Sequence, residues 1–128
     1  MRVLLDTHVF LWWVTDEPSL SEPAHEAIAN PDNDVLISPV SGWEIVIKAA
    51  LGRLELPGPP PEFIPEQLRK NDFGVLPVSM QHALEVSKLP PHHQDPFDRL
   101  LIAQARSDGL PLVSGDAAIR DYEVEVLW

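Results

Sequence analysis

Short apolar runs alternate with longer amphipathic stretches along this chain. The apolar runs have the length and composition of buried strands and cover residues 2–5, 35–37, 75–78, 110–113 and 124–127. Apolar positions in the intervening stretches recur as they do in helices, over residues 9–14, 22–29, 43–51, 65–70, 81–89 and 96–107. Strands that alternate with helices predict an α/β fold with a mainly parallel sheet covered on both faces.

Glycine and proline mark where several of these elements end. Gly52 follows the third helical stretch and Gly109 follows the last, as expected for helix C-termini. The segment PGPPPEFIP, from Pro57 to Pro65, predicts irregular structure. We interpret it as a stiff surface connection between helices, in preference to a polyproline recognition segment.

Composition indicates one globular domain spanning residues 1–128. The chain is 45% hydrophobic and 23% charged and contains no cysteine, which excludes disulfides and thiolate metal sites and favours the cytoplasm. Asp6 and His8 interrupt the apolar N-terminal run, so it resembles a strand and helix more than a signal peptide. No segment has the ~20 apolar residues that a membrane span requires, and we expect no membrane association.

The charge balance limits which partners the protein can bind. Twenty acidic residues against nine basic ones give a formal net charge of −11, which disfavours extended coating of a nucleic acid. A phosphate substrate would need bound cations or a local basic patch. A basic protein partner is equally compatible with this charge.

Two acidic residues follow predicted strands. Asp6 ends the first apolar run, and Asp116 comes directly after the fourth in LPLVSGD. Ligands of open α/β sheets bind beyond the carboxyl ends of the strands, so both positions suit a functional site. Each aspartate could instead be only a helix N-cap, since a helical segment follows each of them.

Two further acidic residues lie in predicted helices. Asp98 falls in the first turn after the expected N-cap Asp95, where a carboxylate gains up to ~1 kcal/mol without any function. Asp98 nevertheless heads the apolar stripe of its helix, where a buried acid needs a partner. Glu44 precedes Lys48 by four residues, and an exposed ion pair worth under ~0.5 kcal/mol is the alternative to a buried functional acid.

Together the four acids predict a metal site at one end of the sheet. Two carboxylates ~4 Å apart repel by about 4 kcal/mol at an effective dielectric near 20, so such a cluster requires cations. Ligation by oxygen alone favours Mg²⁺, with Mn²⁺ as the alternative. Such ions can activate water and stabilise the leaving oxygen when a phosphodiester is cleaved. The proposed catalytic and metal-binding residues are Asp6, Glu44, Asp98 and Asp116.

Three segments resemble the VapC-type PIN-domain toxins of bacterial and archaeal toxin–antitoxin systems. These segments are MRVLLDTHVFLWWV, SPVSGWEIVIKAALGRLELP and HHQDPFDRLLIAQARSDGLPLVSGD, and they run in order through nearly the whole chain. The resemblance implies the family's four metal-site roles for the same acids, with Asp6 and Asp98 as the most direct ligands. It also implies a PIN-like three-layer sandwich with a five-stranded sheet flanked by helices.

The resemblance carries functional expectations as well. It implies a Mg²⁺-dependent endoribonuclease that cleaves RNA, a cognate antitoxin whose basic tail enters the acidic site, and a homodimer. The family's Thr or Ser after the fourth strand corresponds here to Ser114, followed by Gly115. Lys48 is a candidate for orienting Glu44 or for contacting phosphate. Arg99 is a candidate for contacting phosphate, with an ion pair to Asp95 as the alternative.

Histidines and tryptophans give weaker signals. His92 and His93 lack the spacing of a metal-binding histidine pair, and we do not include them in the predicted site. Three tryptophans could stack on unpaired bases, but in apolar helical runs they more often belong to a core or a dimer interface. They are Trp12, Trp13 and Trp43.

Two other classes of protein remain for comparison. A haloacid-dehalogenase-like phosphatase also has an aspartate after its first strand, but its second aspartate is replaced here by His8. No P-loop or G-x-S-x-G motif occurs. The non-enzymatic alternative is an acidic binding module whose carboxylates serve only as helix caps.

Overall fold

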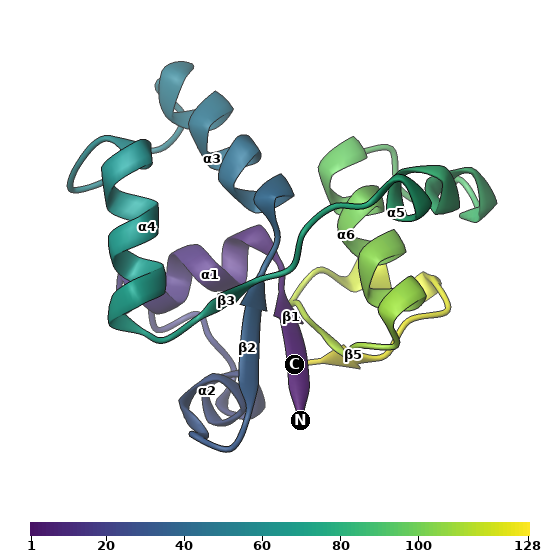
Figure 1. The fold of residues 1–128 in the computed structure, drawn as a ribbon, viewed down its shortest axis with the longest axis horizontal. Coiled ribbons are helices and arrows are strands. Elements are labelled where there is room, and N and C mark those ends of the chain that lie inside the picture. Colours follow the sequence, from purple (N-terminus) through teal and green to yellow (C-terminus); the bar gives the residue numbers. More distant parts are fainter.

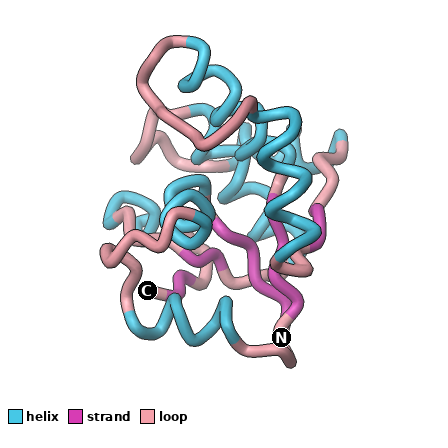
Figure 2. Tube along the Cα trace, turned by 90° about the vertical axis from the view of Figure 1, so that its left-hand side faces the viewer, coloured by secondary structure: helices cyan, strands magenta, loops and turns pink.

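The computed structural model describes residues 1–128 as one parallel sheet with helices on both faces (Figures 1 and 2). The strands are β1 (Arg2–Leu5), β2 (Asp34–Ile37), β3 (Gly74–Val75), β4 (Leu112–Val113) and β5 (Val126–Leu127). The α-helices are α1 (Thr7–Val14), α2 (Glu22–Ala29), α3 (Pro39–Ala50), α4 (Pro60–Lys70), α5 (Met80–Glu85) and α6 (Pro96–Asp108). Two 3₁₀-helices are η1 (Val86–Lys88) and η2 (Ala117–Asp121). The predicted α/β fold with a five-stranded sheet is confirmed.

The strand order is β3-β2-β1-β4-β5, and every neighbouring pair is parallel. Side chains of a strand alternate between the two faces, so the central strand divides its residues between two cores. Leu4 packs in the core that contains α6, whereas Val3 and Leu5 pack in the core that contains α1 and α2. All three are fully buried, which explains why β1 is a continuous apolar run.

Most predicted elements are present with shifted ends. α3 begins at Pro39, earlier than predicted, because Ser38 caps it and proline suits the first helical position. The predicted helix over residues 81–89 is divided into α5 and η1. The strands after β2 are shorter than the apolar runs that predicted them. Helix α6 ends at Gly109, which adopts a left-handed conformation with φ 65°, as predicted.

The proline-rich segment is the clearest correction. Pro57 to Pro65 was predicted to be irregular, but α4 begins at Pro60 and continues through Pro65. Prolines are tolerated in the first turn because the amides there have no partner within the helix. Phe63 is buried, so packing of this helix offsets the interruption at Pro65.

None of the helices has the length and apolar character needed to cross a membrane.

Candidate metal centre

The four predicted acids come from four segments that meet at the carboxyl edge of the sheet. Asp6 directly follows β1 and Asp116 follows β4, while Glu44 lies on α3 and Asp98 in the first turn of α6. β1 has β2 on one side and β4 on the other, so the chain order reverses there. Such a reversal is where α/β sheets form ligand-binding crevices.

Asp6 is both a helix cap and a member of the cluster. One carboxylate oxygen, Oδ1, accepts a hydrogen bond from the Val9 amide at 2.9 Å, and the residue is 3% exposed. Burial raises the pKa of Asp6, while hydrogen bonds from Ser114 and Val9 act in the opposite direction. The charge of Asp116 raises this pKa further, so the acids after β1 and β4 interact.

The charges of nearby acids affect the pKa of Asp98. Asp95 caps α6 as predicted, accepting the amide of Phe97 at 2.8 Å and that of Asp98 at 3.2 Å. Burial raises the pKa of Asp98 to about 6, and the charge of Asp95 adds to this effect. Glu44 and Asp6 raise the pKa as well. Asp98 is therefore coupled by charge to both of these acids.

Glu44 is a buried acid and not half of an exposed ion pair. Its side chain is 2% exposed, and Oε2 lies 2.7 Å from Nζ of the partly exposed Lys48. The other oxygen, Oε1, is buried and has no hydrogen-bond partner. Leaving a buried acceptor unsatisfied costs about 1–3 kcal/mol, and more for a charged group. A cation bound at Oε1 would relieve that cost.

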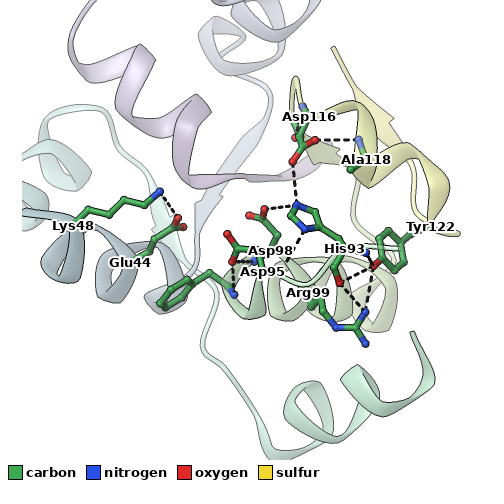
Figure 3. A network of polar contacts seen from close by, with 11 residues as sticks. Glu44, Lys48, His93, Asp95, Asp98, Arg99, Asp116, Ala118 and Tyr122 are labelled. Atoms are coloured by element: carbon green, nitrogen blue, oxygen red, sulfur yellow. Dashed lines mark hydrogen bonds and ion pairs between the residues drawn. The ribbon is translucent and has the colours of Figure 1, made fainter. Parts of the chain in front are cut away.

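His93 lies between Asp98 and Asp116 (Figure 3). Its Nε2 is 2.9 Å from Asp98 Oδ2 and 3.3 Å from Asp116 Oδ2, and one ligand atom from each residue lies within 4.8 Å of the others. Asp6 and Glu44 lie outside this closest group. Sequence spacing did not place His93 at the site, although its position just before the helix cap Asp95 brings it to the same end of α6.

Two further polar residues organise the segment after β4. Asp116 Oδ1 accepts the Ala118 amide at 3.0 Å, which caps η2. The Asp116 amide donates to Ser114 Oγ at 3.1 Å, and Ser114 is fully buried. Ser114 is thus placed to orient both Asp6 and Asp116.

Arg99 does not form the ion pair with Asp95 that was one of its two alternatives. Its guanidinium instead donates to four backbone carbonyls and to the hydroxyl of Tyr122, at 2.9–3.3 Å. These contacts occupy the group that was a candidate for binding phosphate. Arg99 therefore stabilises the segment before α6, a structural role that the sequence did not predict.

The predicted tryptophans have separate neighbours. Trp13 donates to Asn71 Oδ1 at 3.0 Å, Trp12 packs near Trp128 with ring centroids 5.9 Å apart, and Trp43 packs edge-on against Phe97. Trp43 is 60% exposed, so it is not a core residue.

The donor set of the site fits a hard divalent cation. Carboxylate oxygens are the ligands that Mg²⁺ and Mn²⁺ prefer, and several of them converge here under mutual repulsion. The unpartnered Oε1 of Glu44 and the raised pKa values of Asp6 and Asp98 are what a cation would relieve.

The fold is that of a PIN domain. Residues 3–125 match the PIN-domain family, and the chain belongs to that family. Among curated proteins it is similar to ribonuclease VapC22 of Mycobacterium tuberculosis, with 31% identity over 94% of this chain and 91% of the relative. The predicted resemblance to the VapC type is thereby confirmed.

Solved structures share the fold at lower sequence identity. VapBC2 from Rickettsia felis, bound to a DNA fragment from the promoter, has a TM-score of 0.72 and 13% identity, covering 98% of this chain and 97% of that one. DNA-bound VapBC from Salmonella typhimurium has a TM-score of 0.70 and 17% identity, covering 98% and 96%.

Proposed function

We propose that the protein is a divalent-metal-dependent endoribonuclease and the toxin of a toxin–antitoxin pair, acting in the cytoplasm. Family membership and the ribonuclease name of its 31%-identical relative support the nuclease class. The observation that carries the metal-dependent mechanism is the buried, unpartnered Oε1 of Glu44 within a group of mutually repelling carboxylates.

Each acidic residue has a distinct part in this mechanism. Asp6, Glu44, Asp98 and Asp116 would hold Mg²⁺ or Mn²⁺, with Asp6 and Asp98 proposed as the primary ligands. A bound divalent ion lowers the pKa of water and neutralises charge on the phosphodiester. Lys48 holds the Glu44 carboxylate in place through the 2.7 Å ion pair. Ser114 is fully buried, so it acts on Asp6 and not on RNA.

A partly basic hollow beside the site supports RNA as the substrate. It has a volume of about 360 Å³, and its lining includes Trp12, Lys48 and Arg53, although Glu55 shares it. Two cations and an aromatic ring can bind phosphate and stack on an unpaired base. A protein with a net charge of −11 needs a local basic surface to bind a polyanion, and this patch is such a surface.

Cleavage of RNA by purified protein tests this function. We expect cleavage with Mg²⁺ or Mn²⁺, none with EDTA, and at least a 100-fold loss in Asp6→Asn and Asp98→Asn while both remain folded. Asp32→Asn is the matched control, because Asp32 is an exposed acid before β2, at the opposite edge of the sheet. A folded wild type that neither binds these ions nor cleaves RNA from its host would favour the acidic binding module.

We also propose a cognate antitoxin with a basic tail as the partner. The solved relatives include VapBC complexes, and the acidic site of this chain is complementary to a basic segment. Co-purification with the adjacent gene product, and release of nuclease activity on removing it, test this proposal. Loss of affinity in 1 M salt is expected, because charge carries part of the contact.

A homodimer is the remaining part of the proposal. Large apolar side chains are exposed on α3 and α5, including Val46, Met80 and Leu84. An apolar surface of this kind is typical of interaction sites. Light scattering should give twice the 14.3 kDa chain mass for the wild type and a lower mass for Leu84→Glu. A monomeric wild type at high concentration would contradict the dimer.

A further inference from the structure

His93 adds a nitrogen atom to an otherwise carboxylate centre. The residue lies in the connection between η1 and α6, and its Nε2 contacts both Asp98 and Asp116. Two roles suit this position. The ring could be a metal ligand, as its distance to both acids allows, or it could be a hydrogen-bond donor that links them.

The second ring nitrogen distinguishes these roles. Nδ1 lies 3.3 Å from the backbone amide of Asp95, which donates to it. Nδ1 is therefore an acceptor, and the proton of the neutral ring lies on Nε2. A metal-binding histidine has the reverse arrangement, because it coordinates with one nitrogen and donates N–H from the other. The ring of His93 is thus arranged to donate to Asp116 and to lie against Asp98.

The backbone of His93 is held on both sides. Its amide donates to the Tyr122 hydroxyl at 2.7 Å, and its carbonyl accepts from Arg99 at 3.3 Å. Arg99 also donates to the same hydroxyl at 3.2 Å. Arg99 follows Asp98 on α6, and Tyr122 directly follows η2, which Asp116 caps. These contacts join the two elements that carry the acids.

Asp116 needs such support more than Asp98 does. Its side chain is 40% exposed, compared with 12% for Asp98, and it caps a short 3₁₀-helix. Its charge and that of Asp6 repel each other. The Nε2–H of His93 donates to Asp116 Oδ2, and the same nitrogen lies against Asp98 Oδ2, so the contact uses only one oxygen of each carboxylate.

We propose that His93 is a positioning residue of the metal centre: its Nε2–H donates to Asp116, the same nitrogen lies 2.9 Å from Asp98 Oδ2, and the ring thereby holds the two acids together for the cation. This inference rests on the proposed metal-dependent function. It assigns His93 to the centre without making it a ligand.

Calorimetric titration of the purified full chain with Mg²⁺, and separately with Mn²⁺, tests the proposal. We expect His93→Ala to weaken binding of both ions by a similar factor of roughly 10, as loss of an outer hydrogen-bond partner typically does. His93→Gln should recover part of this loss, because its amide N–H can donate to the same oxygens. His92→Ala is the control, since His92 is exposed and packs against the ring of Tyr122.

The outcomes separate this inference from the function on which it rests. A wild type that binds neither ion overturns both. If the wild type binds but His93→Ala binds equally or more tightly, only the positioning role fails. A loss confined to Mn²⁺ that Gln does not recover would make His93 a ligand.

Nitrogen-15 spectra of the histidine rings provide a readout without a metal-binding assay. The proposal expects the Nε2–H form of His93, unchanged when Mg²⁺ is added, and an Nδ1–H form would overturn it.

Discussion

The ionised carboxylate of Asp98 acts against folding. Burial, with the charge of Asp95, raises the pKa of Asp98 to about 6 from an ordinary value of 3.8. Between these values the folded chain retains a proton that the unfolded chain releases, so stability falls as the pH rises through this window. A shift of this size corresponds to about 3 kcal/mol at neutral pH.

Asp98→Asn should therefore stabilise the protein at neutral pH, even though it removes activity. In buffer with EDTA at pH 7.5, we expect its free energy of unfolding to exceed that of the wild type by about 2–3 kcal/mol. The difference should shrink towards zero near pH 4, where wild-type Asp98 is protonated in the folded state. Urea titrations at both pH values check this, and an equal difference at both would contradict it.

Lys48 is the only charged partner of buried Glu44, so its loss should be costly. Lys48→Ala leaves both carboxylate oxygens unpartnered, and we expect a loss of about 1–3 kcal/mol, reduced from a fully buried pair because Lys48 is partly exposed. Lys48→Arg should retain most of the stability. Thermal unfolding of both variants and the wild type in EDTA measures this. A Lys48→Ala variant as stable as the wild type would show that the ion pair contributes nothing.

The candidate acids could be predicted individually, but their support could not. Asp6 and Asp116 follow apolar runs, and Asp98 and Glu44 interrupt apolar helical surfaces, so local pattern alone selects them. His93 contacts Asp98 and Asp116 from an irregular segment whose backbone is held by Arg99 and Tyr122, two residues that lie 23 positions apart in the sequence. Spacing rules for metal-binding histidines do not detect a donor of this kind.

At the scale of elements, packing overrides local propensity most clearly in α4. Pro65 lies inside this helix, lacks the N–H that would donate to the Pro61 carbonyl and is exposed. The sequence predicted a loop here because proline disfavours helix interiors. The burial of Phe63, which only the tertiary fold supplies, favours the helix.

Pro65→Ala should stabilise α4. The substitution restores one backbone hydrogen bond and removes a steric conflict, which together outweigh the added freedom of the unfolded chain, for a net gain of about 1–2 kcal/mol. Pro60→Ala is the matched control and should change little, because Pro60 occupies the first helical position. Chemical denaturation measures both, and a destabilised Pro65→Ala variant would contradict the expectation.

The parallel sheet could be predicted at the scale of the whole molecule because β1 and β2 each contain three consecutive buried apolar residues. The lengths of β3, β4 and β5 could not, since only two residues of each pair with a neighbour whose place the sequence does not specify. The four candidate acids lie at the edge of the sheet that the strand pattern predicted.

A divalent ion should stabilise the whole fold through the same centre. At a concentration 100 times its dissociation constant, Mg²⁺ or Mn²⁺ should add about 2.7 kcal/mol to the free energy of unfolding. Asp98→Asn should lose this response and Asp32→Asn should keep it. Melting curves with and without the ion test the expectation, and an equal response in Asp98→Asn would place ion binding elsewhere.

The pairing of β1 with β4 has a consequence for synthesis on the ribosome. Leu4 aligns with Leu112, so β1 emerges from the exit tunnel long before β4 has been synthesised. A nascent chain that has exposed only α1 to α4 lacks Asp98 and Asp116 entirely. Any nuclease activity is therefore withheld until translation of this region is nearly finished, which would give the proposed antitoxin time to bind the chain before it cleaves RNA.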